Sequence, residues 1–156
     1  MTPADFMREA IRLSKGGMDA GLGGPFGCVI VREGEIIASG QNRVTSANDP
    51  TAHAEVVAIR AACERLSTWE LPGCTLYTSC EPCPMCLAAI YWARIPELYY
   101  ANTRTDAASI GFDDESIYRQ MPLPPEERFL IMHPLLRGEA ITVFAAWRTK
   151  PDKIAY

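Results

Sequence analysis

Three side chains in this sequence have the types and the spacing of zinc ligands. Cys83 and Cys86 are three residues apart, and Pro84 suits the first residue of a helix, where a backbone N–H would have no intrahelical partner. Residues three apart on a helix lie on one face, so both sulfur atoms can reach the same ion. His53 can supply a third ligand, since an imidazole with two thiolates suits Zn²⁺. The spacing therefore predicts a zinc site at His53, Cys83 and Cys86.

Three protein ligands leave the fourth position of a tetrahedral site open for water, which is typical of catalytic zinc. Glu55 follows His53 by two residues and is the predicted proton carrier for that water. Cys80 leaves a second interpretation open, because it is also three residues from Cys83. With Cys80 as a fourth ligand, the site would be a closed Cys₃His structural zinc site with no place for water.

Helices that follow strands are expected to position these ligands. Strands are predicted at residues 28–31, 35–39, 74–79 and 98–101, and helices at residues 3–17, from 53 onward and at 84–93. Two strand–helix–strand units imply parallel strands joined by right-handed crossovers, hence a layered α/β fold. The second and third helices are apolar around most of their circumference, which predicts burial on more than one side. A contact between identical subunits would provide that cover.

The last third of the chain has a weaker pattern. A short helix is predicted at residues 116–120, an edge strand at 129–134 and a longer helix at 137–150. No internal repeat, low-complexity tract or domain-scale linker interrupts the 156 residues. The length therefore predicts one domain.

The composition disfavours some classes of partner. Fifteen Lys and Arg residues against nineteen Asp and Glu give a net charge of −4, whereas proteins that grip nucleic acid usually carry a basic surplus. No apolar run has the length of a membrane span, and the N-terminus lacks a basic-then-apolar leader. We therefore expect a cytoplasmic protein with no membrane or nucleic-acid partner, in which six cysteines stay reduced.

Some further side chains have two interpretations from the residues alone. Phe26 follows a glycine-rich loop and is either a core residue or an aromatic wall for a flat ligand. Asn42 lies in a polar connection, where such residues usually form turns. Trp92 would ordinarily be a core residue, and Asp114 a helix cap or a solvated acid. Pattern alone assigns none of the four to a site.

The order His53-Ala54-Glu55 and then Pro82-Cys83-Pro84-Met85-Cys86 resembles the signature of the cytidine-deaminase-like superfamily of zinc deaminases. The resemblance spans nearly the whole chain, and these segments together look like those of bacterial guanine deaminases. It includes residues 24–27, 42, 48–55, 77–86, 90–94, 111–114, 146–148 and 156. Residues 122–138 carry little of it.

The resemblance implies a three-layer α/β/α fold with a central mixed sheet of about five strands, forming one zinc-dependent deaminase domain over residues 1–156. It implies one Zn²⁺ per subunit, with Glu55 and Asp114 as catalytic residues. The implied substrate contacts are Phe26, Asn42, the Ala54 backbone, Trp92, Asp114 and Tyr156. It also implies a homodimer, with exchange of residues 138–156 between subunits as one arrangement, so that Tyr156 closes a neighbouring pocket.

The implied reaction is the hydrolytic deamination of guanine, a small-molecule purine base, to xanthine and ammonia. Two alternatives in the same superfamily are deamination of another free base or triazine, such as cytosine or ammeline, and deamination of adenosine in tRNA. The acidic charge and the match at Asp114 and Tyr156 disfavour tRNA. A non-enzymatic Cys₃His zinc module is the alternative from another class, and it would release no ammonia.

Overall fold

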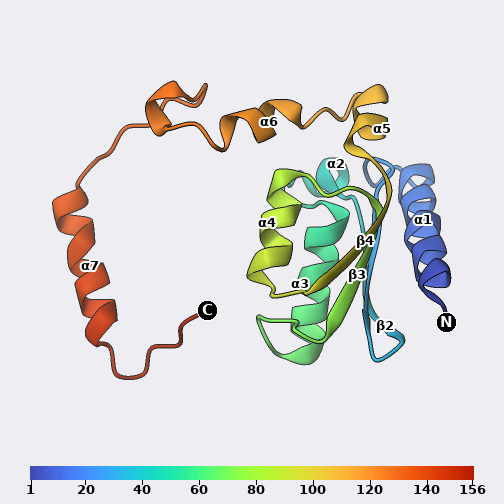
Figure 1. Cartoon of the computed structure of the whole chain (residues 1–156), viewed down its shortest axis with the longest axis horizontal. Coiled ribbons are helices and arrows are strands. Elements are labelled where there is room, and N and C mark those ends of the chain that lie inside the picture. Colours follow the sequence, from blue (N-terminus) through green and yellow to red (C-terminus); the bar gives the residue numbers. More distant parts are fainter. The chain divides into compact units, whose positions relative to one another are not determined.

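The computed structural model describes residues 1–156, and its central element is a mixed sheet of four strands in the order β2-β1-β3-β4 (Figure 1). The strands are β1 (Gly27–Arg32), β2 (Glu35–Gln41), β3 (Cys74–Cys80) and β4 (Glu97–Asn102). Strand β1 is antiparallel to both β2 and β3, whereas β3 and β4 are parallel. The predicted α/β class with a mixed sheet is confirmed.

Both faces of the sheet are apolar, because the side chains that point to either face are buried. Cys28, Ile30 and Leu76 belong to one cluster of buried side chains, and Val29 and Tyr77 belong to another. Successive residues of a strand point to opposite faces, so a run such as 28–31 that is buried throughout must be covered on both sides.

Three helices provide this cover and complete a three-layer α/β/α fold. Helix α1 (Pro3–Asp19) packs on one face, where Phe6 joins Val29 and Tyr77. Helices α3 (Ala54–Leu66) and α4 (Pro84–Trp92) lie on the other face, as Figure 1 shows. The N-terminus of α1 is closed by a capping box between Thr2 and Asp5, which satisfies backbone donors that have no partner within the helix.

The crossovers explain why the starts of α3 and α4 come together. Strands β2 and β3 run in the same direction, because both are antiparallel to β1. Helix α3 follows β2, and α4 follows β3, so both helices begin beyond the carboxyl ends of strands that point the same way. This edge of the sheet is where the predicted ligands lie.

Close backbone packing holds β2 against the first turn of α3. A Cβ atom added at Gly40 would lie 2.1 Å from the carbonyl oxygen of Ala54 and 2.8 Å from the backbone nitrogen of Ala58. Only a glycine allows this approach, since backbone atoms cannot move aside as a flexible side chain can.

Two short helices complete the first unit, Met1–Asp114: α2 (Val44–Ala47) and α5 (Arg104–Ser109). The second unit, Glu115–Tyr156, contains α6 (Glu115–Gln120), the 3₁₀ helix η1 (Pro125–Glu127) and α7 (Arg137–Thr149). None of these last three elements has a buried residue. No helix in the chain has both the length and the apolar character needed to cross a lipid bilayer.

The edge strand predicted at residues 129–134 is wrong, because this segment forms no strand. A strand exists only when its backbone groups pair with a neighbouring strand. The Phe129 N–H instead donates to the side-chain oxygen of Gln120 at 2.6 Å, and Pro134 has no N–H to donate.

Candidate active site

The structure brings the three predicted metal ligands together. The His53 Nδ1 atom lies 3.5 Å from Cys83 Sγ and 3.4 Å from Cys86 Sγ, and all three ligand atoms fall within 4.8 Å of one another. Ligands about 2.0–2.3 Å from a zinc ion lie roughly 3–4 Å apart in a tetrahedral arrangement. One imidazole and two thiols at these separations therefore fit a zinc ion.

Helix starts aim these ligands at a common point. His53 is the N-cap of α3 and Cys83 is the N-cap of α4, and both have extended backbone dihedrals. Neither side chain caps its own helix, so both remain available to an ion. Pro84 occupies the first turn of α4, as the sequence predicts, and Cys86 follows within that turn. The positive ends of two helices favour thiolate at this place.

The two thiols change each other's pKa. A hydrogen bond from Cys86 is the largest cause that lowers the pKa of Cys83 to about 4, and the contact with His53 adds to it. The same interaction, together with burial, raises the pKa of Cys86. Both thiols lose their protons when they ligate a metal.

Glu55 is a buried carboxyl group beside these ligands. Its side chain belongs to a residue only 5% exposed, and its Oε2 atom lies 3.4 Å from Cys86 Sγ. Burial is the largest cause that raises the pKa of Glu55 above its usual value. A carboxyl group with a raised pKa beside a metal site is suited to accept and return a proton near neutral pH.

Thr78 holds Glu55 in place, and the sequence analysis did not identify it. The fully buried Thr78 hydroxyl donates to Glu55 Oε1 at 3.0 Å. This bond occupies one carboxylate oxygen and leaves Oε2 facing the ligands. A threonine in a strand is unremarkable in sequence, so only the packing of α3 on β3 identifies this contact.

Asn42 is buried and its acceptor atom is occupied. Its Oδ1 atom accepts from the backbone N–H groups of Gly24 at 3.3 Å and Val44 at 3.2 Å. Gly23 permits this contact, because a Cβ atom there would lie 2.2 Å from Oδ1. The turn interpretation of Asn42 is thus correct, and its Nδ2 group is the part that remains to donate to a ligand.

Phe26 packs partly against the core cluster and partly against Phe112. The two rings meet edge to face, with centroids 4.9 Å apart and planes at 89°. Phe112 comes two residues before Asp114, so this contact attaches the loop at residues 111–114 to the glycine-rich loop. The sequence pattern does not indicate this contact of Phe112 with Phe26.

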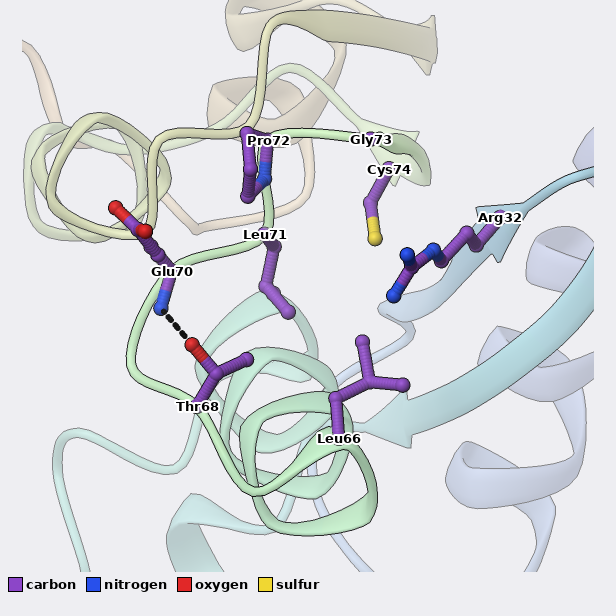
Figure 2. A pocket seen from close by; sticks show the side chains of 8 residues that line it. All are labelled: Arg32, Leu66, Thr68, Glu70, Leu71, Pro72, Gly73 and Cys74. Atoms are coloured by element: carbon purple, nitrogen blue, oxygen red, sulfur yellow. Dashed lines mark hydrogen bonds between the residues drawn. The ribbon is translucent and has the colours of Figure 1, made fainter.

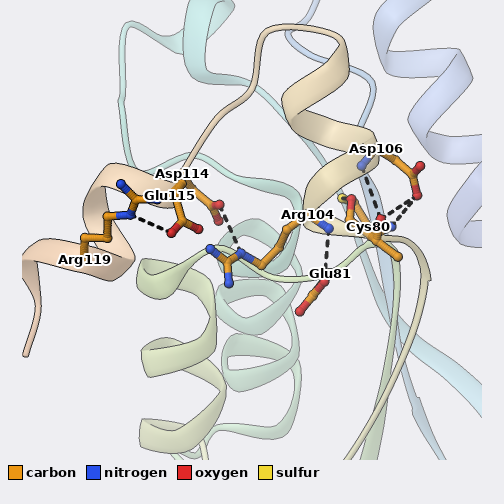
Figure 3. Close-up of polar contacts among 8 residues, drawn as sticks. Cys80, Glu81, Arg104, Asp106, Asp114, Glu115 and Arg119 are labelled. Carbon is orange, nitrogen blue, oxygen red and sulfur yellow. Dashed lines mark hydrogen bonds and ion pairs between the residues drawn. The ribbon is translucent and has the colours of Figure 1, made fainter.

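Asp114 directly precedes α6 and forms an ion pair. Its Oδ1 atom lies 3.3 Å from Nε of Arg104 at the start of α5 (Figure 3). The Asp114 side chain is 19% exposed, which makes it neither a core residue nor a freely solvated acid.

Three predicted substrate contacts differ in how far the structure supports them. Ala54 is fully buried in the first turn of α3, directly between His53 and Glu55. Trp92 is 61% exposed at the last residue of α4, about 9 Å along the helix axis from Cys86. Tyr156 belongs to the second unit and is exposed. The roles of Ala54, Trp92 and Tyr156 in substrate binding stay predictions.

Cys80 is separate from the ligand cluster. It is absent from the group of side chains that could hold an ion, and its thiol donates instead to the Thr103 carbonyl oxygen at 3.7 Å. Burial raises the pKa of Cys80 to about 11, which disfavours the thiolate needed for metal binding. This geometry argues against the closed Cys₃His site.

A small pocket of about 170 Å³ lies elsewhere in the first unit (Figure 2). It is lined by residues from the end of α3 to the start of β3 together with Arg32, and the Glu70 N–H donates to Thr68 Oγ1 within it. His53 precedes the opposite end of α3, which spans 13 residues and hence about 20 Å. The pocket contains none of the residues predicted to act on a substrate.

Comparison with known families identifies the class of protein. Residues 2–102 match the family model for the cytidine and deoxycytidylate deaminase zinc-binding region. This match includes His53, Glu55, Cys83 and Cys86. The chain belongs to this family of zinc-dependent deaminases.

Individual relatives within this family differ in how much of the chain they match. The chain is 53% identical over 156 residues to guanine deaminase from Bacillus subtilis, and the alignment covers all of both proteins. The crystal structure of guanine deaminase from Bacillus subtilis superposes with a TM-score of 0.97 at 52% identity, covering 100% of this chain and 99% of that one. A tRNA-specific adenosine deaminase from Aquifex aeolicus is 45% identical over 96 residues, covering 62% of this chain and 63% of that protein.

Proposed function

We infer that this protein is an aminohydrolase that converts guanine and water to xanthine and ammonia. The observation that carries this conclusion is the buried Glu55 carboxyl group beside the His53, Cys83 and Cys86 donor set. Full-length similarity to a guanine deaminase selects the substrate within the family. The similarity to the tRNA-specific enzyme covers only 62% of this chain, and the net charge of −4 also disfavours a nucleic-acid substrate.

The chain would hold one zinc ion per subunit through His53 Nδ1, Cys83 Sγ and Cys86 Sγ. When bound, zinc acts as a Lewis acid that makes a water molecule acidic enough to serve as a nucleophile near neutral pH. Glu55 accepts the proton of that water at Oε2, because Oε1 is held by Thr78. It delivers this proton to a ring nitrogen of guanine, which makes C2 more electrophilic, and the oxygen of the water forms a bond to C2. Glu55 then moves the second proton of that oxygen to the amino nitrogen as the C2–N bond breaks, so that ammonia leaves and a C2 carbonyl forms.

The proposed substrate contacts use polar atoms that hydrogen bonds within the protein leave unoccupied. Asn42 can offer only its Nδ2 donor, because two backbone N–H groups occupy Oδ1, and purines present carbonyl and ring-nitrogen acceptors. Asp114 accepts hydrogen bonds from the N–H groups of guanine and takes part in proton transfer. Phe26 packs on the flat base, and such aromatic stacking contributes about 1 kcal/mol beyond area burial.

Three further contacts complete the proposed pocket. The backbone of Ala54 binds the base. Ala54 lies between the proposed zinc ligand His53 and the proton carrier Glu55 in the sequence. Trp92 stacks on the base opposite Phe26, and Tyr156 closes the pocket. A role for Tyr156 in a neighbouring subunit would explain why it belongs to a unit without buried residues in its helices.

The protein is proposed to act as a homodimer in the cytoplasm, with exchange of residues 138–156. Helix α7 has no buried residue and exposes Ile141, Phe144 and Trp147. Their spacing of three places them on one side of the helix, and such an apolar side normally packs against another surface. All six cysteines are free thiols, in keeping with a reducing compartment. Light scattering coupled to size-exclusion chromatography tests the dimer, and a monomer at micromolar concentration would contradict it.

Ammonia release measured in parallel on guanine, cytosine, ammeline, adenine and a tRNA substrate tests the function. We expect turnover of guanine with xanthine as the product, and loss of turnover in Glu55→Gln with zinc content unchanged. Faster turnover of another base or of tRNA would replace guanine as the substrate. Absence of turnover on all five, with zinc bound, would favour a structural zinc module.

A further inference from the structure

We propose that Arg104 is a positioning residue that orients the Asp114 carboxylate toward the base, and that Glu81 connects Arg104 to the metal-binding loop. This inference rests on the proposed role of Asp114 in guanine deamination. It assigns a function to two charged residues that neither the metal site nor the proton carrier explains.

The ion pair between Arg104 and Asp114 is sheltered. The side chains are 28% and 19% exposed, whereas those of the surface pair Arg8–Asp5 are 73% and 41% exposed. Exposed pairs contribute little because water screens them and their side chains stay mobile. A sheltered pair keeps its geometry, and here Nε of Arg104 engages Oδ1 of Asp114 (Figure 3).

The backbone of Arg104 is held by Glu81. The Arg104 N–H donates to Glu81 Oε2 at 3.0 Å. Arg104 is the first residue of α5, where a backbone N–H has no partner within the helix. Glu81 supplies that partner from a separate segment of the chain, so the start of α5 is attached to the residue that follows β3.

Glu81 is itself part of the loop that carries the metal ligands. It lies two residues before Cys83, and its own N–H donates to the Asn102 carbonyl oxygen at 2.8 Å. Asn102 in turn pairs with Cys80 in the parallel β3–β4 ladder. The loop after β3 and the segment after β4 are therefore joined by backbone and side-chain hydrogen bonds. The path from Cys83 through Glu81 and Arg104 to Asp114 sets the Asp114 carboxylate relative to the metal ligands.

The loop that carries Asp114 has a second anchor at Phe112. The ring of Phe112 packs edge to face on Phe26, and Arg104 holds Asp114 two residues later. Because Arg104 occupies Oδ1, the Oδ2 atom is left to accept from guanine. Guanine presents adjacent N–H donors on its ring and its amino group, and a carboxylate selects them over the acceptors that another base would present there.

Steady-state kinetics on guanine test this role through a double-mutant cycle. We expect Arg104→Met to lower kcat/KM by about 10- to 100-fold, the range typical when a partner that orients a functional group is removed. Arg104→Lys keeps the charge but not the geometry of the guanidinium, and should recover part of this loss. In Asp114→Asn, adding Arg104→Met should change kcat/KM by less than about twofold, because a residue that acts through Asp114 has nothing left to orient.

Arg119→Met is the matched control. Arg119 pairs with Glu115 at 2.9 Å on an exposed helix surface, with side chains 76% and 47% exposed, so kcat/KM should not change. Zinc content and the thermal midpoint are measured for each variant. If Arg104→Met does not fold, Arg104→Lys enters the same cycle with Asp114→Asn. Losses that multiply in the double variant would overturn the proposal.

A crystal structure of the zinc-loaded Arg104→Met variant separates this proposal from the proposed function. We expect the Asp114 carboxylate to leave its wild-type position while the three metal ligands stay in place. An unmoved Asp114 would overturn the positioning role whatever the activity. If the wild type does not act on guanine, the proposed function fails, and the displacement of Asp114 still decides the positioning role.

Discussion

Replacing Thr78 by valine removes the hydrogen bond that holds Glu55 while keeping nearly the same shape. Thr78 is fully buried and donates to Glu55 Oε1 at 3.0 Å. A hydrogen bond to an ionised group contributes about 1.5–3 kcal/mol, and each 1.36 kcal/mol of transition-state stabilisation is tenfold in rate. If this bond serves to orient Glu55, Thr78→Val should lower kcat/KM for guanine by about 10- to 150-fold.

The control for this variant is Thr78→Ser, which keeps the hydroxyl donor and loses only a methyl group. We expect Thr78→Ser to retain most of the wild-type kcat/KM, although loss of a buried methyl group costs about 1 kcal/mol of stability. The assay is xanthine formation at saturating zinc, with zinc content measured for each protein. Equal kcat/KM in the valine and serine variants would refute the idea that this bond prepares Glu55.

Cys80→Ser should retain zinc and guanine turnover, because the Cys80 thiol contacts the Thr103 carbonyl oxygen rather than the ligand cluster; loss of the metal, measured by atomic absorption, would restore the Cys₃His interpretation. Gly40→Ala should lower the free energy of unfolding by about 1–3 kcal/mol or more, since its Cβ would lie 2.1 Å from the Ala54 carbonyl oxygen. Gly138→Ala, where a Cβ meets nothing within 4 Å, is its control in thermal unfolding and should be neutral or slightly stabilising. Removing zinc with a chelator should abolish ammonia release, and one equivalent of Zn²⁺ per chain should restore it; activity that persists without metal would exclude a zinc-dependent reaction.

The elements and ligands that were predictable from sequence depend on local rules. Pro3 and Pro84 mark helix starts because the first turn tolerates a missing N–H, and α1 and α4 do begin at these residues. The continuous burial of β1 follows from its uninterrupted apolar run, and the positions of His53 and Cys83 before apolar helices follow from the same kind of reasoning. The sequence therefore predicts the role of a residue when that role depends on neighbours close in the chain.

The rest of the site depends on contacts between distant segments. Thr78 and Glu55 are 23 residues apart, and nothing in a strand threonine indicates a carboxylate partner. In the sequence, Arg104 and Asp114 each resemble a solvated charge. Their pairing depends on the direction that the chain takes after β4, where α5 begins. Residues 129–132 have the composition of a strand, but composition does not supply a pairing partner. The predictions fail where a residue acquires its role from tertiary packing alone.

The hydrogen bonds that Glu81 makes with Asn102 and Arg104 attach the segment after β4 to the metal-binding loop. This attachment limits how substrate preference can change during evolution. Residues 2–102, which match the family, contain the predicted metal ligands and Glu55, whereas Arg104, Phe112 and Asp114 follow that region. A chain could therefore change the segment that carries Asp114 and keep its predicted metal ligands and Glu55. Any such replacement must keep the hydrogen bond that Glu81 makes with the start of α5, and a chimera built with its junction after Asn102 should retain zinc and have an altered selectivity for guanine.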